Sequence, residues 1–196
     1  MEIKEIELKD RNIIIFNDVD ESTMSSDVEK IVQINQEDEA WIRNVYNALE
    51  ISGAKFSKTT IEMPHIQVLL STYGGCVYDG LSLYDVIKNS KTEVDITCFG
   101  KIMSIGIIIL LSAKTRKAYR NTTFMIHELS SGVIGKVADM EESIDEAKRL
   151  NKVLFDIIKK ETKINKSLLD DIYNKKKDLF LTAEEALELG LITEII

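Results

Sequence analysis

The chain has 196 residues, 44% hydrophobic and 30% charged, which supplies one domain with a core and excludes disordered and low-complexity classes. Its 33 acidic and 25 basic residues give a formal net charge of -8, which argues against a nucleic-acid partner because such binders need a basic surface. Two cysteines, Cys76 and Cys98, cannot form a disulfide framework and fit a reducing compartment.

The elements expected from periodicity alternate along the chain. In order they are a strand at Asn12–Phe16, one or two helices over Thr23–Leu49, a loop or edge hairpin at Ile51–Pro64, a strand at Ile66–Leu70, a helix at Val77–Ile87, a strand at Val94–Phe99 and a helix at Ser104–Ala113. The later elements are a strand at Phe124–His127, helices at Val137–Thr162, Ser167–Tyr173 and Ala183–Glu188, and a strand at Leu191–Ile196. This alternation predicts βαβ units, a largely parallel sheet and one α/β domain over residues 1–196.

Two details refine these expectations. Trp41 and Tyr46 are candidate core anchors of the first helical region. Thr182 and Glu185 form a capping box that opens the last helix, and Gly190 closes it.

The sequence predicts neither a leader nor a membrane segment. Met1–Phe16 lacks a basic start followed by an apolar stretch, so we expect no secretory signal. The longest apolar-rich stretch, Ile102–Ala113, has 12 residues, whereas a bilayer span needs about 20. We therefore expect a cytoplasmic protein in which this stretch contributes to a buried core helix. The cysteines and histidines form no zinc-binding pattern.

Ser104 is the first candidate for chemistry, because it follows a strand and precedes the apolar helix. The first N–H groups of a helix lack intrahelical partners and favour an oxyanion, so the N–H group of Ile105 is expected to face a carbonyl that Ser104 attacks. The alternative is that Ser104 merely caps the helix.

The other candidates are a histidine and a pair of glycines. The sequence has two histidines, His65 and His127, and His127 ends a strand, where sites of parallel sheets gather. A serine nucleophile commonly uses such a base, although a structural role for His127 stays open. Gly74 and Gly75 follow the strand Ile66–Leu70 and allow a close backbone approach to a ligand; the alternative is a plain tight turn.

Four segments, STYGGCVYDGLSLYDVI, CFGKIMSIG, FMIHE and DLFLTAEEALELGLITEII, resemble in this order the proteolytic subunit of the ATP-dependent Clp protease. The resemblance covers Ile66–Ile196 and is weaker over Asn12–Leu49. It implies a crotonase-like Clp protease fold, with Val137–Thr162 as the long handle helix, and a serine endopeptidase that acts through an acyl-enzyme.

Carried over by position, the resemblance makes Ser104 the nucleophile, His127 the general base and Asp178 the residue that orients the histidine. It assigns the oxyanion hole to the N–H groups of Gly75 and Ile105. Asp178 follows three lysines, which would help to keep it ionised, and its alternative is a solvated loop carboxylate.

The chain departs from the family pattern at several positions. Tyr73 replaces the loop proline, Ile102 and Met103 replace small residues before the serine, and Glu128-Leu129 stand where Gln-Pro is common. These departures leave substrate preference and partner docking open, although all three residue types of the triad are present.

The resemblance also implies partners. We expect heptameric rings stacked into a 14-subunit barrel, unfolded polypeptides as substrates, and an AAA+ unfoldase that alone uses ATP, since this chain has no GxxxxGK[ST] loop and its chemistry needs no metal or cofactor. Ser130–Lys136 is expected to form an extended strand near His127. Two alternatives stay open: a catalytically silent ring subunit, and another enzyme on the same fold, either a crotonase-type acyl-CoA hydratase or isomerase or a Ser/Lys signal peptide peptidase.

Overall fold

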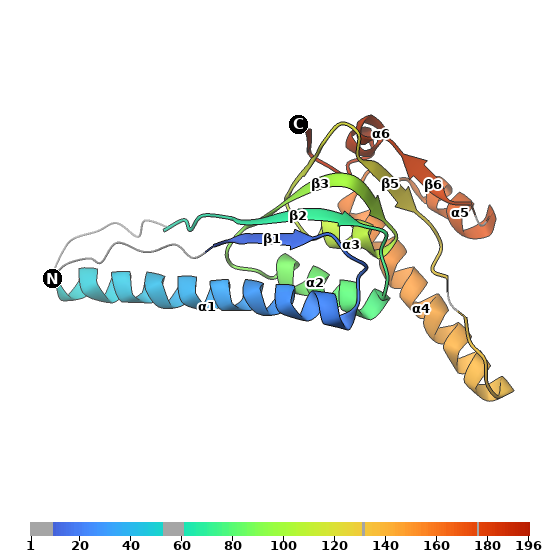
Figure 1. Cartoon of the computed structure of the whole chain (residues 1–196), viewed down its shortest axis with the longest axis horizontal. Helices are drawn as coiled ribbons and strands as arrows, with labels where there is room; N and C mark the ends of the chain where they lie inside the picture. The colour runs from blue at the N-terminus through green and yellow to red at the C-terminus, as the bar shows by residue number, and fades with distance from the viewer. Residues whose placement is uncertain (1–9, 53–60, 131, 176) are drawn as a thin grey trace.

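The computed structural model describes residues 10–52, 61–130, 132–175 and 177–196. Strands and helices alternate through most of the described chain, and the strands form one seven-stranded sheet (Figure 1). The strands are β1 (Asn12–Ile15), β2 (Ile66–Thr72), β3 (Val94–Met103), β4 (Thr115–Ala118), β5 (Thr123–Ile126), β6 (Leu179–Leu181) and β7 (Glu194–Ile195). The helices are α1 (Glu21–Ile51), α2 (Val77–Lys88), α3 (Ile105–Leu111), α4 (Val137–Glu161), α5 (Lys166–Lys175) and α6 (Ala183–Glu188).

The sheet is parallel except at one edge, as the alternation of elements predicts. Its main path runs β1-β2-β3-β4-β7, while β5 pairs with β3 and β6 pairs antiparallel with β5. Strand β3 therefore changes neighbours along its length: Asp95–Cys98 pair with β4, and Lys101–Met103 pair with β5. Gly100 lies at this change with a φ of 65°, which favours glycine, and the register against β2 shifts at the same level.

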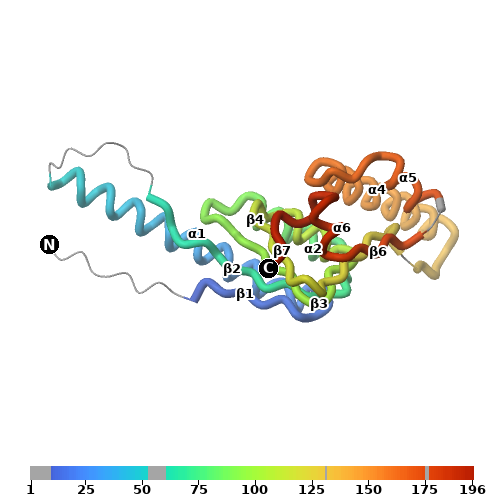
Figure 2. Tube along the Cα trace, turned by 90° about the horizontal axis from the view of Figure 1, so that it is seen from above, coloured from blue at the N-terminus to red at the C-terminus, as the bar shows by residue number. Residues whose placement is uncertain are grey.

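Helices α1, α2 and α3 lie on one side of β1, β2 and β3 (Figure 1), whereas α6 packs against β5, β6 and β7. Helix α1 packs on α2, α2 on α3, and α3 on α4. Figures 1 and 2 show α4 and α5 at one end of the molecule and the carboxyl end of α1, drawn in cyan, at the other. Helix α4 is amphipathic and packs through one face, with Leu150 and Ile158 buried.

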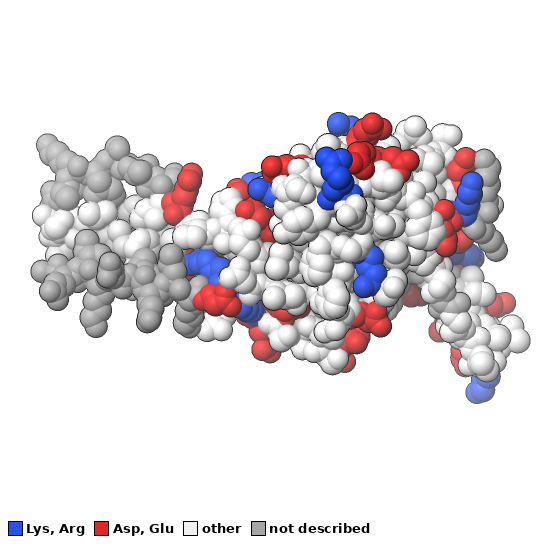
Figure 3. Space-filling model, turned by 45° about the horizontal axis from the view of Figure 1, so that its top comes forward, with Lys and Arg blue, Asp and Glu red and all other residues white. Residues whose placement is uncertain are grey.

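The other face of β1 and β2 carries exposed apolar side chains. Ile14 of β1 and Leu69 of β2 alternate with core residues, and Phe16 follows directly after β1. The exposed fractions of Ile14, Phe16 and Leu69 are 65%, 58% and 37%. Figure 3 shows a largely uncharged area over the middle of the molecule, with charged side chains around it. This face therefore exposes apolar side chains at positions where a solvated sheet would usually carry polar ones.

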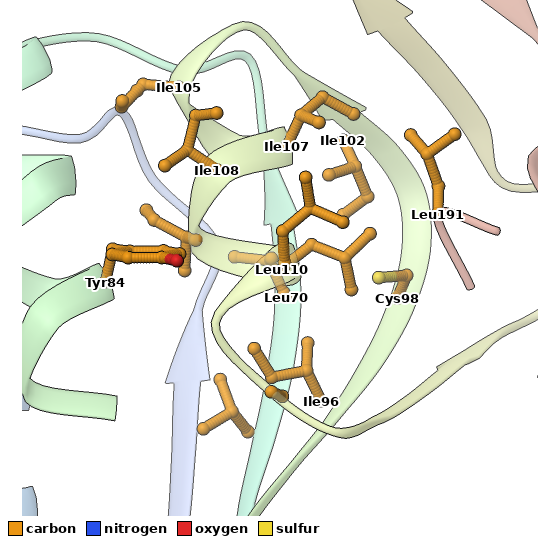
Figure 4. Close-up of a cluster of buried hydrophobic side chains, with 14 of the residues drawn as sticks. Leu70, Tyr84, Ile96, Cys98, Ile102, Ile105, Ile107, Ile108, Leu110 and Leu191 are labelled. Carbon is orange, nitrogen blue, oxygen red and sulfur yellow. The ribbon is translucent and has the colours of Figure 1, made fainter. Parts of the chain in front are cut away.

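Helix α3 is the centre of the core, as expected for the apolar stretch Ile102–Ala113. All seven of its residues are buried. Figure 4 shows Ile107 of α3 beside Ile102 of β3, and Leu110 of α3 beside Leu70 of β2. Burial on all sides outweighs the modest helix propensity of isoleucine. Cys98 lies in the same cluster, and its burial raises the pKa of the thiol, so it acts as an apolar core residue.

Helix α1 is one continuous helix of 31 residues, opened by a capping box of Asp20 and Thr23. Its buried side chains end at Asp38, because the helix then runs beyond the end of the sheet (Figure 1). Trp41 and Tyr46 are only partly buried, so the expectation that they anchor the core is wrong.

Three further expectations concern the last helix and two connecting segments. The capping box of Thr182 and Glu185 is confirmed, with the Thr182 hydroxyl accepting from the Glu185 N–H group. The described residues of Ser130–Lys136 form no strand, because the chain leaves the sheet after β5. Part of Ile51–Pro64 lies outside the described residues.

Two strands were not expected, β4 and β6. The sequence of β4 is Thr-Arg-Lys-Ala, which has no apolar alternation, and β6 has only three residues. Both are defined by backbone pairing to partners that are distant in sequence, which a local pattern does not reveal.

Candidate active site

Ser104 lies at the junction of β3 and α3 in a constrained backbone conformation. Its φ of 55° and ψ of -126° make it the one non-glycine residue with positive φ in the described part of the chain. Such a conformation costs free energy and persists only where the surroundings enforce it. The Ser104 N–H group donates to the Met125 carbonyl at 3.0 Å, which ties this turn to β5.

The Ser104 side chain faces a histidine. Its Oγ lies 2.8 Å from Nε2 of His127, a hydrogen bond between half-buried groups. Ser104 does occupy the N-cap position of α3, but its side chain makes no capping hydrogen bond. The Ser104 hydroxyl therefore hydrogen-bonds to His127 and does not cap the helix.

Strand pairing brings these two residues together. Strands β3 and β5 are parallel neighbours with Met103 opposite Met125, so Ser104 and His127 both follow the carboxyl ends of adjacent strands. The expectation that His127 lies at such an edge is confirmed. His65, in contrast, lies on the surface with its Nδ1 3.0 Å from Oδ2 of Asp95.

Gly74 and Gly75 approach the serine from β2, with φ values of 101° and 149°. A Cβ atom at Gly74 would lie 2.7 Å from Cβ of Ser104 and 3.3 Å from the Ile105 nitrogen. This contact requires glycine, and it shows that the loop packs directly on the start of α3.

Two backbone N–H groups are available beside the serine. In the described part of the chain, neither Gly75 nor Ile105 donates its N–H group in a hydrogen bond. Ile105 is the first residue of α3, whose amide has no intrahelical acceptor. Unpaired donors near a serine hydroxyl are the arrangement that stabilises an oxyanion.

A cavity of about 320 Å³ lies in front of these groups. Gly75, Ser104 and His127 line it, and α3 and α4 supply an apolar wall. That wall consists of Ile108, Leu154, Phe155 and Ile158. The hydroxyl thus opens into a space that fits an apolar side chain of a ligand.

Asp178 lies one residue before β6 and is exposed. The antiparallel register of β5 and β6 places Ile126 opposite Leu179, so one step further sets His127 opposite Asp178. Among the described residues, no hydrogen bond joins the Asp178 carboxylate to His127. The fold therefore brings Asp178 to the level of the histidine without a direct contact.

Two residues that support the site were missed by the sequence analysis. The Val19 N–H group donates to the Gly74 carbonyl at 2.8 Å, and the Val19 carbonyl accepts from the Cys76 N–H group at 2.7 Å. Asn151 of α4, only 6% exposed, accepts through Oδ1 from the Leu129 N–H group and so holds the segment after His127. A polar residue within the apolar face of a helix is a usable signal for Asn151, whereas nothing local distinguishes Val19.

The described residues contain neither a candidate membrane span nor a candidate metal site. None of the described helices has the length and apolarity needed to cross a bilayer. No group of three or more His, Cys, Asp or Glu side chains in the described ranges is arranged to hold a metal ion.

A strained serine that is hydrogen-bonded to a histidine, with backbone N–H groups beside it that have no acceptor among the described residues, is the arrangement of a serine hydrolase site. The Clp protease family model matches residues 56–196. The ATP-dependent Clp protease proteolytic subunit of Deinococcus radiodurans is 37% identical over 134 residues, which are 67% of this chain and 64% of that protein. Proteolytic subunit 2 of Chlamydia trachomatis is 31% identical over 170 residues, 86% of this chain and 81% of that protein.

A solved structure has the same fold. The ClpP1 N165D mutant from Listeria monocytogenes superimposes with a TM-score of 0.73 at 21% identity, covering 95% of this chain and 91% of that one. The chain belongs to the Clp protease family. The predicted fold is confirmed, and the relatives support the predicted class of serine-type proteolytic subunit over a hydratase.

Proposed function

We propose that this chain is a serine endopeptidase that hydrolyses unfolded polypeptides, with Ser104 as nucleophile and His127 as general base. The observation that carries the assignment is the 2.8 Å hydrogen bond between Ser104 Oγ and His127 Nε2 at a strained turn. Family membership supports the reaction class, and the geometry supports the choice of residues.

The proposed reaction proceeds through an acyl-enzyme. His127 accepts the Ser104 proton as the hydroxyl attacks the scissile carbonyl, and it later gives that proton to the leaving amine. The N–H groups of Gly75 and Ile105 stabilise the tetrahedral oxyanion. Water then attacks the ester by the same route and regenerates the serine. This sequence needs no metal or organic cofactor.

Asp178 is proposed to orient the imidazole and to stabilise its protonated form. Its place opposite His127 in the β5–β6 register supports this role, although the two side chains are not bonded. For this role the Asp178 carboxylate must come within hydrogen-bond distance of the His127 ring.

The chain is further proposed to act in the cytoplasm as heptameric rings stacked into a 14-subunit barrel. Its curated relatives are named as subunits of an ATP-dependent protease, which supports assembly with a separate AAA+ unfoldase. Helix α4, 25 residues long, and the exposed apolar side chains Ile14, Phe16 and Leu69 provide surfaces on which such contacts can form.

Active-site labelling tests the catalytic assignment. A fluorophosphonate should modify Ser104, and mass spectrometry of peptides should locate the adduct. Ser104→Ala should abolish both labelling and hydrolysis of a short unstructured peptide. Ser112→Ala is the matched control, because Ser112 lies at the other end of α3 and donates to the Ile109 carbonyl. Full peptidase activity in Ser104→Ala would refute the assignment.

Sedimentation at micromolar concentration tests the assembly. A species of about 14 subunits is expected, and a single species of 22.2 kDa would contradict the barrel. Peptide cleavage should need no ATP, while a folded substrate should need the unfoldase with ATP.

A further inference from the structure

The loop that presents Gly75 to the serine lacks the restraint that its family uses. Tyr73 stands where the family has a proline, whose ring would fix φ at this position. Gly74 and Gly75 come next with positive φ, and glycine has the greatest backbone freedom of all residue types. An oxyanion donor must nevertheless be held in place before the reaction. Other contacts must therefore fix this loop.

Val19 supplies one of these contacts on the carboxyl side of Tyr73. Its backbone hydrogen bonds hold the Gly74 carbonyl and the Cys76 N–H group. They leave the Tyr73 side chain unrestrained. Tyr73 is 64% exposed, so burial in the core does not immobilise its ring either.

A lysine contacts this ring. Nζ of Lys101 lies 4.3 Å from the centroid of the Tyr73 ring and 5.2 Å from that of Phe16. Phe16 in turn stacks on Phe99, with centroids 5.6 Å apart and planes within 4°. An ammonium group within about 6 Å of a ring face is attracted by its quadrupole. The lysine thus joins two aromatic rings from separate segments.

Lys101 lies close to the nucleophile along the chain. It belongs to the part of β3 that pairs with β5, three residues before Ser104. Tyr73 lines the same cavity as Ser104 and immediately precedes the two glycines. The contact therefore ties the oxyanion-hole loop to the strand that carries the nucleophile.

We propose that Lys101 is a positioning residue for the oxyanion hole: its cation–π contact with Tyr73 holds Gly75 against the start of α3, in place of the proline. Lys101 touches no reacting atom and acts through the loop. This inference rests on the proposed peptidase function. It predicts that weakening the contact lowers kcat and leaves KM nearly unchanged, because the oxyanion is bound only in the transition state.

A graded series of rings at position 73 tests the contact itself. Phenylalanine and its mono-, di- and trifluorinated forms are placed at position 73. Each added fluorine lowers the negative electrostatic potential of the ring face with little change in the size of the ring. Across the series kcat should fall about two- to fivefold, the factor expected of a cation–π contact at an exposed site. In the Lys101→Met background kcat should be the same for all rings of the series. In the Lys101→Arg background kcat should fall across the series as it does with Lys101.

A second readout does not depend on activity. The Cys76 amide, bonded to Val19, reports opening of the loop, and its hydrogen exchange should accelerate about two- to fivefold in Lys101→Met. Lys114→Met is the matched control, since Lys114 is a surface lysine paired with Glu93, and it should change neither readout.

The outcomes separate this inference from the function on which it rests. The positioning role would be overturned, even in an active peptidase, if kcat fell equally across the ring series with Lys101 and with Lys101→Met. It would also be overturned if only KM changed. If the wild-type chain proves inactive, the proposed function fails, and unchanged exchange of the Cys76 amide in Lys101→Met would then overturn the positioning role as well.

Discussion

Replacement of Gly74 by alanine is the sharpest test of the site geometry. Gly74 has a φ of 101°, and an added Cβ would lie 2.7 Å from Cβ of Ser104 and 2.9 Å from the Met103 carbonyl oxygen. Both distances are below what real Cβ atoms tolerate, and one of the two atoms belongs to the backbone. The substitution must therefore move the loop, the serine, or both.

The magnitude follows from two costs. A non-glycine residue in a sparsely populated backbone region costs about 1–3 kcal/mol, and overpacking of a tight contact costs about 1–3 kcal/mol more. The sum, about 2–6 kcal/mol, is within the stability of most domains, so a folded variant is expected. A displacement near 1 Å at the nucleophile should lower kcat/KM about 100-fold.

Gly132→Ala is the control, because an added Cβ at Gly132 meets no atom within 4 Å. Urea unfolding gives the change in stability, and hydrolysis of a short peptide gives kcat/KM. Gly132→Ala should change the free energy of unfolding by less than about 0.5 kcal/mol. If Gly74→Ala behaves like this control in both assays, the described packing of the loop on Ser104 is wrong.

Three further substitutions test other parts of the structure. Burial raises the pKa of Asp27 to about 6, so the folded state binds more protons than the unfolded state between about pH 4 and 6. The free energy of unfolding therefore falls as the pH rises through that window. Chemical denaturation should show that Asp27→Asn stabilises the protein at pH 7 but not at pH 4. Asp178→Asn should lower kcat by up to about 10⁴-fold with unchanged stability, whereas unchanged kcat would remove Asp178 from the mechanism. Asp38→Asn should lower stability by about 3 kcal/mol, because it leaves the part-buried Arg11 guanidinium, 2.6 Å from Asp38, without its charge partner; a thermal shift within error would contradict this.

The sequence alone predicted the class of fold and named Ser104 and His127 as candidate site residues. Buried strands such as Ile66–Leu70 and the uniformly apolar α3 follow from local hydrophobic patterning, which depends on neighbours in the chain. Ser104 was a candidate because it lies between a strand and an apolar helix, and His127 because it ends a strand, where sites of parallel sheets gather. Their roles as nucleophile and base came from the resemblance to the Clp protease family.

Asp178 required more than local pattern. Among several aspartates after His127, the resemblance to a family selected it, and the structure adds that β6 brings it opposite the histidine. Strand β6 itself could not be predicted, because three residues carry no periodicity. Its pairing with β5 is a contact between residues more than 50 positions apart.

The tertiary structure alone decided which residues contact the loop that contains Tyr73, Gly74 and Gly75. The hydrogen bonds of Val19 and the contact of Lys101 with Tyr73 join segments that are separated in sequence by 28 to 57 positions. Nothing in the neighbourhood of Val19 or Lys101 marks either residue, because backbone hydrogen bonds and ring contacts depend on which strands lie side by side. Local patterning specifies which segments form strands and helices, whereas the order and register of the sheet decide which side chains meet.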